Sequence, residues 1–341
     1  MLKQASWDLR SRLDRRAACH IGITIPGPDA IVEFLIVHSD APTDRVAEDF
    51  VPEFLLAESD WPAMPEQHRA FLVGALPTLR TFSALCGLAA GGSFISGRLD
   101  RYSDLDLVVV VTEQATPLGK SERQEIASSL GPLLGAFTGE HVNEPRLLIC
   151  LYGPPLLHVD LKFLPALQLN PRVEDPIVLW DRDGGVRRAL DTGSAAYPSP
   201  DLQWIEDRFW VWVHYGAAKI GRGELFEAVD FIGYLRKLVL GPLALQQDGA
   251  RPDGVRRVEE LPPAVVSALL ATVATYDPSS CHRALSTTIA LYRDLRAALG
   301  PPSLVQHRAA EAASVAYLDA IGRTLGVDGP DAGAHAVSGT R

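Results

Sequence analysis

The stretch from Gly91 to Val111 constrains this chain more than any other, because it joins a glycine turn, two closely spaced aspartates and a run of valines. Small residues at Gly91 and Gly92 let backbone N–H groups approach anionic oxygens, and the hydroxyl of Ser93 adds a donor. The turn therefore predicts a phosphate-binding loop, with Gly91, Gly92 and Ser93 as its binding residues.

The two aspartates of this stretch, Asp104 and Asp106, lead into an apolar run. They are separated by one residue, so on a strand their side chains point to the same face. The run is apolar on both faces, as expected of a buried central strand. Carboxylates at the mouth of such a strand are costly unless a cation or strong donors hold them. Mg²⁺ favours carboxylate and phosphate oxygens, so the sequence predicts a magnesium site at Asp104 and Asp106.

Each half of the stretch also has an ordinary explanation. Gly-Gly-Ser is common in loops, and an Asp-x-Asp pair can be the solvated edge of a strand. The order of glycine turn, spacer, paired carboxylates and valine run favours the functional interpretation over either explanation alone.

Gly92-Ser93 followed by Ser103-Asp104-Leu105-Asp106-Leu107 resembles the signature of the DNA polymerase β-like nucleotidyltransferase superfamily. That signature is a Gly-Ser turn, a short spacer, and an acidic-x-acidic pair between apolar positions. The resemblance covers Pro65 to Phe163. It implies a small mixed sheet, two Mg²⁺ ions, and transfer of a nucleoside monophosphate from a nucleoside triphosphate to an acceptor.

The same resemblance implies a third carboxylate on a strand beside the Asp-x-Asp strand, and Asp160 fits that place. Residues 146–164 contain two apolar runs around Gly153-Pro154-Pro155, which predict an antiparallel hairpin. In its second strand His158, Asp160 and Lys162 share one face. Taken alone, that pattern indicates an exposed face, and a polar edge explains His158 and Lys162 equally well.

Other segments between residues 65 and 134 have apolar residues at the spacing of a helix or a strand. Helical spacing predicts helices over residues 65–82 and 121–134, and apolar runs predict strands over 83–90 and 106–112. Phe94–Arg101 predicts a helical turn whose first N–H groups would face a bound phosphate. Arg98 and Arg101 are candidates for contacting the triphosphate. An ordinary position on the protein surface explains each arginine equally well.

From Asp201 the chain becomes helical. Asp201 is a predicted N-cap, and the aromatic side chains of the helix after it surround most of its circumference, which places it centrally in a bundle. The predicted helices cover 201–221, 223–241, 262–275, 282–298 and 304–325.

The predicted fold class is α+β, a small mixed-sheet nucleotidyltransferase core followed by an all-α helical bundle. We divide the chain into an N-terminal extension of uncertain structure, the core, the helical domain and a disordered tail, at residues 1–61, 62–195, 196–326 and 327–341. This plan resembles the aminoglycoside and lincosamide nucleotidyltransferases. Several of those enzymes carry arginines just after the Gly-Ser, whereas this chain has Phe94, Ile95 and Ser96, so its triphosphate contacts come from elsewhere.

Three carboxylates, Glu224, Glu227 and Asp230, lie on a polar side of the second predicted helix. One interpretation is an ordinary solvated face. The other is an acidic face that closes the cleft over the metals and holds a cationic or polyhydroxy acceptor.

Composition limits the partners. A net charge of −10 with pI near 5.4 argues against general binding of nucleic acid, which requires a basic face. The four cysteines are scattered without metal-ligand spacing and indicate reduced, buried thiols. No apolar stretch reaches membrane-spanning length, and the N-terminus lacks the apolar core of a signal peptide. We therefore expect a cytoplasmic protein with neither nucleic acid nor membrane as a partner.

These inferences combine into one expected activity, the transfer of AMP from Mg·ATP to a hydroxyl of a small, antibiotic-like acceptor, with ATP or another NTP as co-substrate. Asp104, Asp106 and Asp160 are the expected catalytic and metal-binding residues. Two alternatives stay open: a nucleotidyltransferase-like antitoxin or interaction module, and an enzyme that nucleotidylates a protein or, less compatibly with the charge, RNA.

Overall fold

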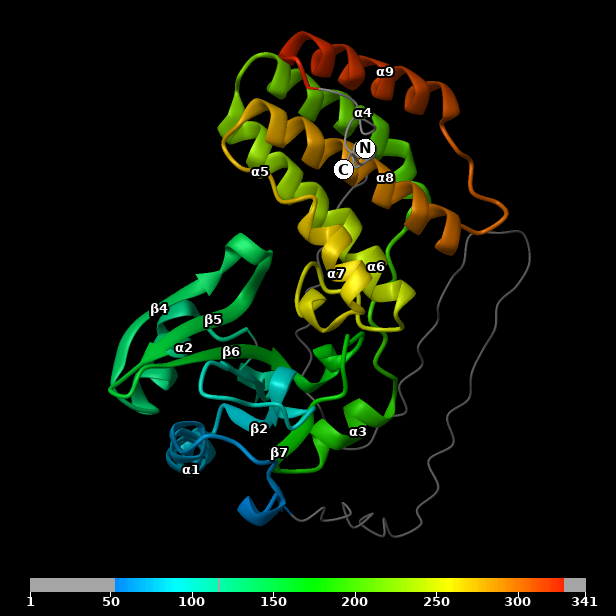
Figure 1. Ribbon diagram of the computed structural model, residues 1–341. Helices are drawn as coiled ribbons and strands as arrows, with labels where there is room; N and C mark the ends of the chain where they lie inside the picture. The colour runs from blue at the N-terminus through cyan, green and yellow to red at the C-terminus, as the bar shows by residue number, and fades with distance from the viewer. Residues whose placement is uncertain (1–52, 116, 328–341) are drawn as a thin grey trace, which may run out of the picture. The chain divides into compact units, whose positions relative to one another are not determined.

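The structure is a computed structural model that describes residues 53–115 and 117–327 (Figure 1). All of these lie in the second of the two units into which the chain divides, the one that begins at Pro52. Most of the predicted N-terminal extension and nearly all of the predicted tail lie outside the described residues.

The described residues contain a seven-stranded mixed sheet with strand order β1-β7-β2-β3-β6-β5-β4 (Figure 1). Only the central pair β3 and β6 is parallel, and every other neighbouring pair is antiparallel. The mixed sheet and the hairpin of β5 and β6 confirm the sequence predictions. The strands are β1 Phe54–Leu55, β2 Leu85–Ala90, β3 Leu105–Val111, β4 Leu133–Gly139, β5 Glu144–Tyr152, β6 Leu157–Pro165 and β7 Ile177–Asp181.

Strand β3 is buried on both faces, as the valine run predicts. Leu105 and Leu107 belong to the core that includes residues of α1 (Glu66–Thr81) and α2 (Lys120–Ser129). Val110 packs on the other face with Val186 of α3 (Gly185–Asp191). Because side chains alternate along a strand, Asp106 lies on the α3 face.

The predicted helix over 121–134 is wrong at its end. α2 stops at Ser129, and the residues from Leu133 form β4, which pairs with β5. Gly131 and Pro132 separate the two elements, since proline offers no N–H and disfavours helical geometry at the residue before it.

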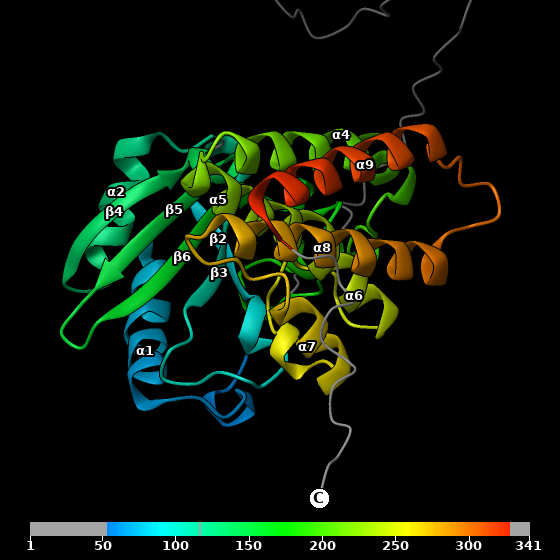
Figure 2. The same ribbon diagram turned by 45° about the horizontal axis from the view of Figure 1, so that its top comes forward.

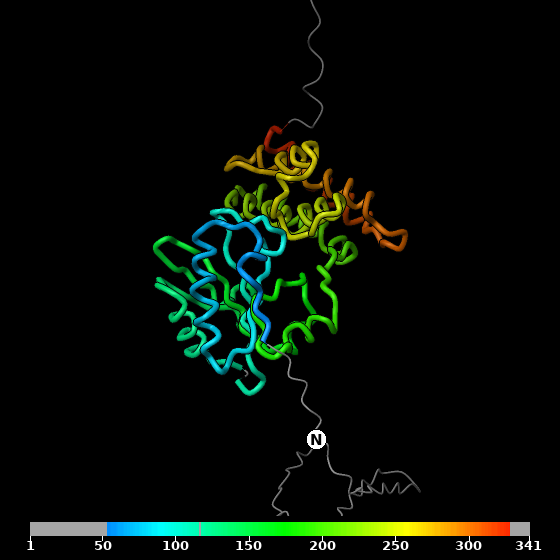
Figure 3. Tube along the Cα trace, turned by 90° about the horizontal axis from the view of Figure 1, so that it is seen from below, coloured from blue at the N-terminus to red at the C-terminus, as the bar shows by residue number. Residues whose placement is uncertain are grey.

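The second half is helical, as predicted, and its longest helices run alongside one another (Figure 2). α4 packs against α5, α8 and α9, which confirms its central position. The Asp201 carboxylate accepts from the Trp204 N–H at 2.9 Å, which confirms the N-cap. The helices are α4 Leu202–Gly221, α5 Leu225–Leu235, a π-helical turn Arg236–Leu240, α6 Gly241–Gln247, α7 Pro263–Leu270, α8 Pro278–Leu299 and α9 Arg308–Leu325. In Figure 3 these segments, yellow-green to red, gather on one side and the blue to green strands and helices on the other.

The second helix of this half does not stop at Gly241-Pro242 as expected. Helical backbone continues from α5 through the π turn into α6. Pro242 has no N–H to donate to the preceding turn, and the π turn before it absorbs this irregularity.

A buried carboxylate holds this bundle together. Glu206 of α4 is fully buried and accepts from Trp210 Nε1 at 3.0 Å, Tyr292 Oη at 2.6 Å and Arg296 Nη1 at 3.0 Å. The backbone N–H of His307 donates to it at 3.0 Å. The Glu206 cluster therefore connects α4 with α8 and with the segment that enters α9.

The cysteines agree with the sequence prediction. Cys86, Cys150 and Cys281 are free and buried, and Cys19 lies outside the described residues. No helix among the described residues is long and apolar enough to cross a membrane. The 3₁₀ turns are Glu58–Asp60, Gly92–Phe94, Glu113–Ala115, Glu140–Val142, Ala166–Leu169 and Val258–Glu260.

Candidate active site

The glycine turn lies directly against the Asp106 carboxylate. β2 ends at Ala90, and the Gly91 N–H donates to the Asp106 carbonyl at 2.8 Å. Gly92 has φ +56°, a conformation that favours glycine, and a Cβ there would clash with Asp106 Oδ2. Only glycine fits at this position, so the turn and the carboxylate form one unit.

Helix α1 fixes the chain just before β3. His68 is fully buried in α1, and its Nε2 donates to the Ser103 carbonyl at 2.8 Å. The Asp100 carboxylate accepts from the Tyr102 N–H at 2.8 Å and closes the preceding turn. Asp104 follows directly, so its position depends on α1 as well as on the sheet.

Asp106 and Asp160 are register partners on the parallel pair of β3 and β6. Register partners on neighbouring strands lie about 4.8 Å apart and point to the same face. Asp160 is partly buried, and its Oδ1 lies 2.9 Å from His158 Nε2. The fold thus brings together two carboxylates that are separated by more than fifty residues in sequence.

Burial and like charge disfavour ionisation of this pair. Burial raises the pKa of Asp106 to about 6, and the neighbouring carboxylates of Asp104, Asp160 and Glu174 push it in the same direction, against Arg256. Burial also raises the pKa of Asp160; His158 opposes this shift and Asp104 adds to it. A positive ion would relieve the repulsion.

The donor set fits Mg²⁺ in its chemistry, since it consists of carboxylate oxygens. As placed, no three His, Cys, Asp or Glu side chains of the described residues converge closely enough to hold a metal ion. Asp160 is engaged by His158, and Glu174 has partners of its own. Metal binding by Asp104, Asp106 and Asp160 stays a prediction.

Glu174 is a member of the site that sequence reasoning missed. Its Oε1 accepts from the Gly92 N–H at 2.8 Å, and its Oε2 accepts from Arg251 Nη1 at 2.6 Å. Arg172 positions its loop by donating to the carbonyls of Leu190 at 2.9 Å and Gly193 at 2.7 Å. The loop carries no periodic pattern, and 82 residues separate Glu174 from Gly92, so the sequence offered no local signal.

The arginines near the turn have other partners. Arg98 donates to both oxygens of Glu260, at 2.7 and 3.2 Å, and Arg101 donates to the Tyr102 hydroxyl. The Ser93 carbonyl accepts from the Arg98 N–H at 3.1 Å. The roles of Ser93, Arg98 and Arg101 toward phosphate stay predictions.

The predicted acceptor residues are all exposed. Glu224 accepts from Lys219 Nζ at 2.6 Å, and Glu227 accepts from the Tyr215 hydroxyl at 2.6 Å. These contacts suit a solvated face and are compatible with an acceptor surface, so a role of Glu224, Glu227 or Asp230 in acceptor binding stays a prediction.

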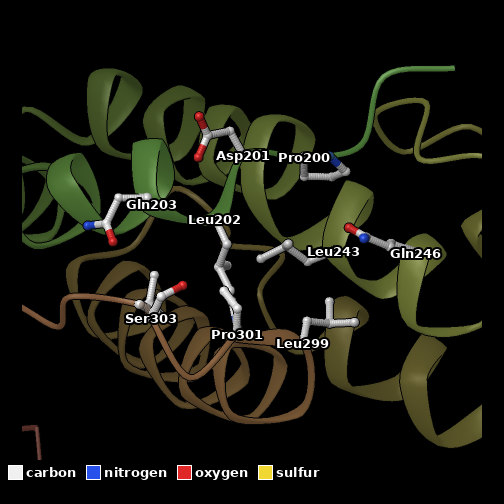
Figure 4. Close-up of a pocket in the computed structure, with 10 residues that line it drawn as sticks. Pro200, Asp201, Leu202, Gln203, Leu243, Gln246, Leu299, Pro301 and Ser303 are labelled. Atoms are coloured by element: carbon white, nitrogen blue, oxygen red, sulfur yellow. The ribbon is translucent and has the colours of Figure 1, made fainter.

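A cavity of about 310 Å³ lies between the start of α4, α6 and the end of α8 (Figure 4). None of the site carboxylates lines it. Two of its polar side chains make contacts within the fold: Asp201 caps α4, and Gln203 exchanges hydrogen bonds with the Val305 backbone.

The mixed sheet followed by helices gives this chain an α+β fold, in which the glycine turn lies beside the in-register pair of Asp106 and Asp160. Two solved structures are similar to it. One is an aminoglycoside 6-adenyltransferase from Bacillus subtilis, with 15% identity and a TM-score of 0.33, covering 73% of this chain and 97% of that one. The other is a nucleotidyltransferase-like protein from Exiguobacterium sibiricum, with 11% identity and a TM-score of 0.30, covering 75% and 90%.

No protein-family model and no curated protein matches the chain. At such identities and TM-scores the structural likeness says nothing about activity, and the functional argument rests on the carboxylates and the glycine turn.

Proposed function

We propose that this protein transfers a nucleotidyl group, AMP from ATP, to a hydroxyl of a small acceptor in the presence of Mg²⁺. The observation that carries the proposal is the placement of the Gly91–Gly92 turn directly against Asp106, whose register partner on the parallel strand is Asp160. A phosphate-binding turn beside paired carboxylates is what metal-dependent phosphoryl chemistry requires.

Each residue has a distinct role in this proposal. Gly91, Gly92 and Ser93 bind the terminal phosphates through N–H groups and a hydroxyl. Asp104 and Asp106 hold the metal, which supplies charge neutralisation at the reacting phosphate when bound. Asp160 binds the ion that activates the acceptor hydroxyl, or itself accepts the proton of that hydroxyl.

The acceptor in this proposal is a small cationic or polyhydroxy molecule rather than nucleic acid. The exposed carboxylates Glu224, Glu227 and Asp230 and the net charge of −10 favour a positively charged partner. The scattered cysteines are in keeping with a cytoplasmic location.

To test this proposal, the purified protein is incubated with Mg²⁺, a panel of hydroxyl-bearing amines and, one at a time, each nucleoside triphosphate labelled at the α-phosphate. We expect label on a small molecule, release of pyrophosphate, and preference for ATP. Asp106→Asn and Asp160→Asn should abolish transfer. Asp183→Asn is the matched control, because Asp183 is an exposed turn residue whose carboxylate accepts from the Gly185 N–H.

Turnover close to wild type in Asp106→Asn would contradict the assignment. Label that appears on protein instead of on a small molecule would replace the small acceptor by a protein one.

A further inference from the structure

The phosphate-binding turn already holds an anion from the chain itself. The Glu174 carboxylate bridges two groups suited to phosphate oxygens, the Gly92 N–H at 2.8 Å and the Arg251 guanidinium at 2.6 Å. A Cβ on Gly91 would lie only 2.8 Å from Glu174 Oε1, so the carboxylate sits against bare backbone.

We propose that Glu174 occupies the place of a substrate phosphate, and that an incoming triphosphate exchanges with it and takes over both the Gly92 N–H and Arg251. Arg251 is then a nucleotide-binding residue, and Glu174 is an internal competitor that keeps the turn and the arginine paired before nucleotide arrives. This inference rests on the proposed nucleotidyltransferase function.

The exchange leaves no donor unpaired. Before it, the Gly92 N–H and Arg251 share one carboxylate; after it, they share a phosphate, which offers more acceptor oxygens. Glu174 is partly exposed and belongs to a loop, so it can turn toward water once released.

Arg251 has a second partner besides Glu174. Its guanidinium lies 4.2 Å from the centroid of the Tyr197 ring, a cation–π contact independent of the carboxylate. The segment that carries it is packed onto α6, where Gly241 lies so close to Gly254 that a Cβ would clash with the Gly254 carbonyl. The backbone of the segment that carries Arg251 is thus packed against the helical half.

Arg251 also offers a positive charge that the sequence just after the Gly-Ser lacks. Residues 94–96, just after the Gly-Ser, carry no positive charge. Arg256, from the same segment as Arg251, stabilises the ionised form of Asp106 through its charge. The helical half thus brings positive charge to a turn whose following residues 94–96 carry none.

The experiment measures equilibrium binding of α,β-methylene-ATP with Mg²⁺, and of inorganic tripolyphosphate, to the full chain. Arg251→Ala should weaken binding of both about tenfold or more, because a charge-assisted contact is lost. Glu174→Gln should tighten binding of both by a similar factor, because the competing negative charge is gone. Unfolding midpoints of the variants confirm that each is folded.

Arg293→Ala is the matched control. Its ion pair with Glu311 has a length of 2.7 Å, against 2.6 Å for Arg251 with Glu174, and the two arginine side chains are 43% and 44% exposed. We expect binding in Arg293→Ala to equal that of the wild type.

Weaker binding in Glu174→Gln would overturn the proposal, because Glu174 would then assist binding instead of competing with it. Unchanged binding in Arg251→Ala would overturn it as well. If the wild type transfers nucleotide but the two variants do not show these changes in binding, the exchange between Glu174 and phosphate is contradicted and the proposed function is not. If the variants show the predicted changes in binding but the wild type transfers no nucleotide, the exchange is supported and the proposed function is contradicted.

Discussion

Asp106 is a residue whose charge serves the proposed chemistry at the expense of the fold. Its pKa of about 6 lies roughly two units above the ordinary value of 3.8, first because of burial and then because of neighbouring carboxylates. Each unit corresponds to about 1.4 kcal/mol. We predict that Asp106→Asn stabilises the metal-free protein by about 1–3 kcal/mol at pH 7–8, measured by urea denaturation with EDTA.

The pH dependence of this gain has a fixed sign. Because the folded pKa of Asp106 is raised, the wild type bears no penalty below the unfolded pKa near 4 and the full penalty above pH 6. The stability difference should therefore vanish at pH 4 and grow between pH 4 and 6. A difference that is constant with pH would show that the gain does not come from this carboxylate.

Gly92 supports a second prediction at this scale. Gly92→Ala places a methyl group against the Asp106 carboxylate at a φ that alanine rarely adopts, so we expect loss of nucleotide transfer and about 1–3 kcal/mol lower stability. Gly74→Ala is the control, since Gly74 lies in α1 with nothing within 4 Å of its added Cβ. Alanine there should stabilise the protein slightly, and thermal unfolding of both variants checks the contrast.

At the scale of elements, the Glu206 cluster controls how α4, α8 and α9 associate. Glu206→Ala leaves the buried Arg296 without one carboxylate partner, so we predict a loss of about 3–5 kcal/mol in the free energy of unfolding, measured in urea. Asp207→Ala is the control one residue along, because that carboxylate is exposed and pairs only with exposed or flexible partners. Its unfolding free energy should change little.

The same carboxylate gives a pH prediction of opposite sign to that of Asp106. Burial by itself would raise the pKa of Glu206, but hydrogen bonds from Tyr292, the His307 N–H, Trp210 and Arg296 hold the pKa below its ordinary value. Its stabilisation is therefore complete above the unfolded pKa near 4.5 and is lost as pH falls through the lower folded value. Glu206→Gln should narrow the stability difference between pH 7 and pH 4.

The elements that sequence predicted well are those with an unbroken period. The strand from Leu105, the hairpin around residues 146–164 and the long helices carry such patterns over many residues. β4 was missed because its apolar residues continue the spacing of α2, although Gly131 and Pro132 between them were a readable break.

The residues of the candidate site also divide into those that a local sequence pattern predicts and those that only folding brings together. Asp104, Asp106 and the glycines lie within one short stretch, and Asp160 follows from its strand and from the family resemblance. Glu174 and Arg251 come from loops without period and meet only in the folded chain, so no local pattern could predict their contact.

At the scale of the whole described molecule, the two halves meet through ion pairs at the glycine turn. Arg98 pairs with Glu260, and Glu174 pairs with Arg251. Exposed ion pairs of this kind contribute little to stability. We therefore interpret them as contacts that nucleotide can rearrange, with each half supplying one arginine and one carboxylate.

The central claim is that the glycine turn and the aspartates form one metal-dependent nucleotide site, and equilibrium binding of labelled ATP tests it without knowledge of the acceptor. We predict that the wild type binds ATP with Mg²⁺ and loses most of that affinity in EDTA. Asp106→Asn should bind at least about tenfold more weakly with Mg²⁺ and show little further loss in EDTA. Equal, metal-independent binding by the wild type and Asp106→Asn would contradict the account.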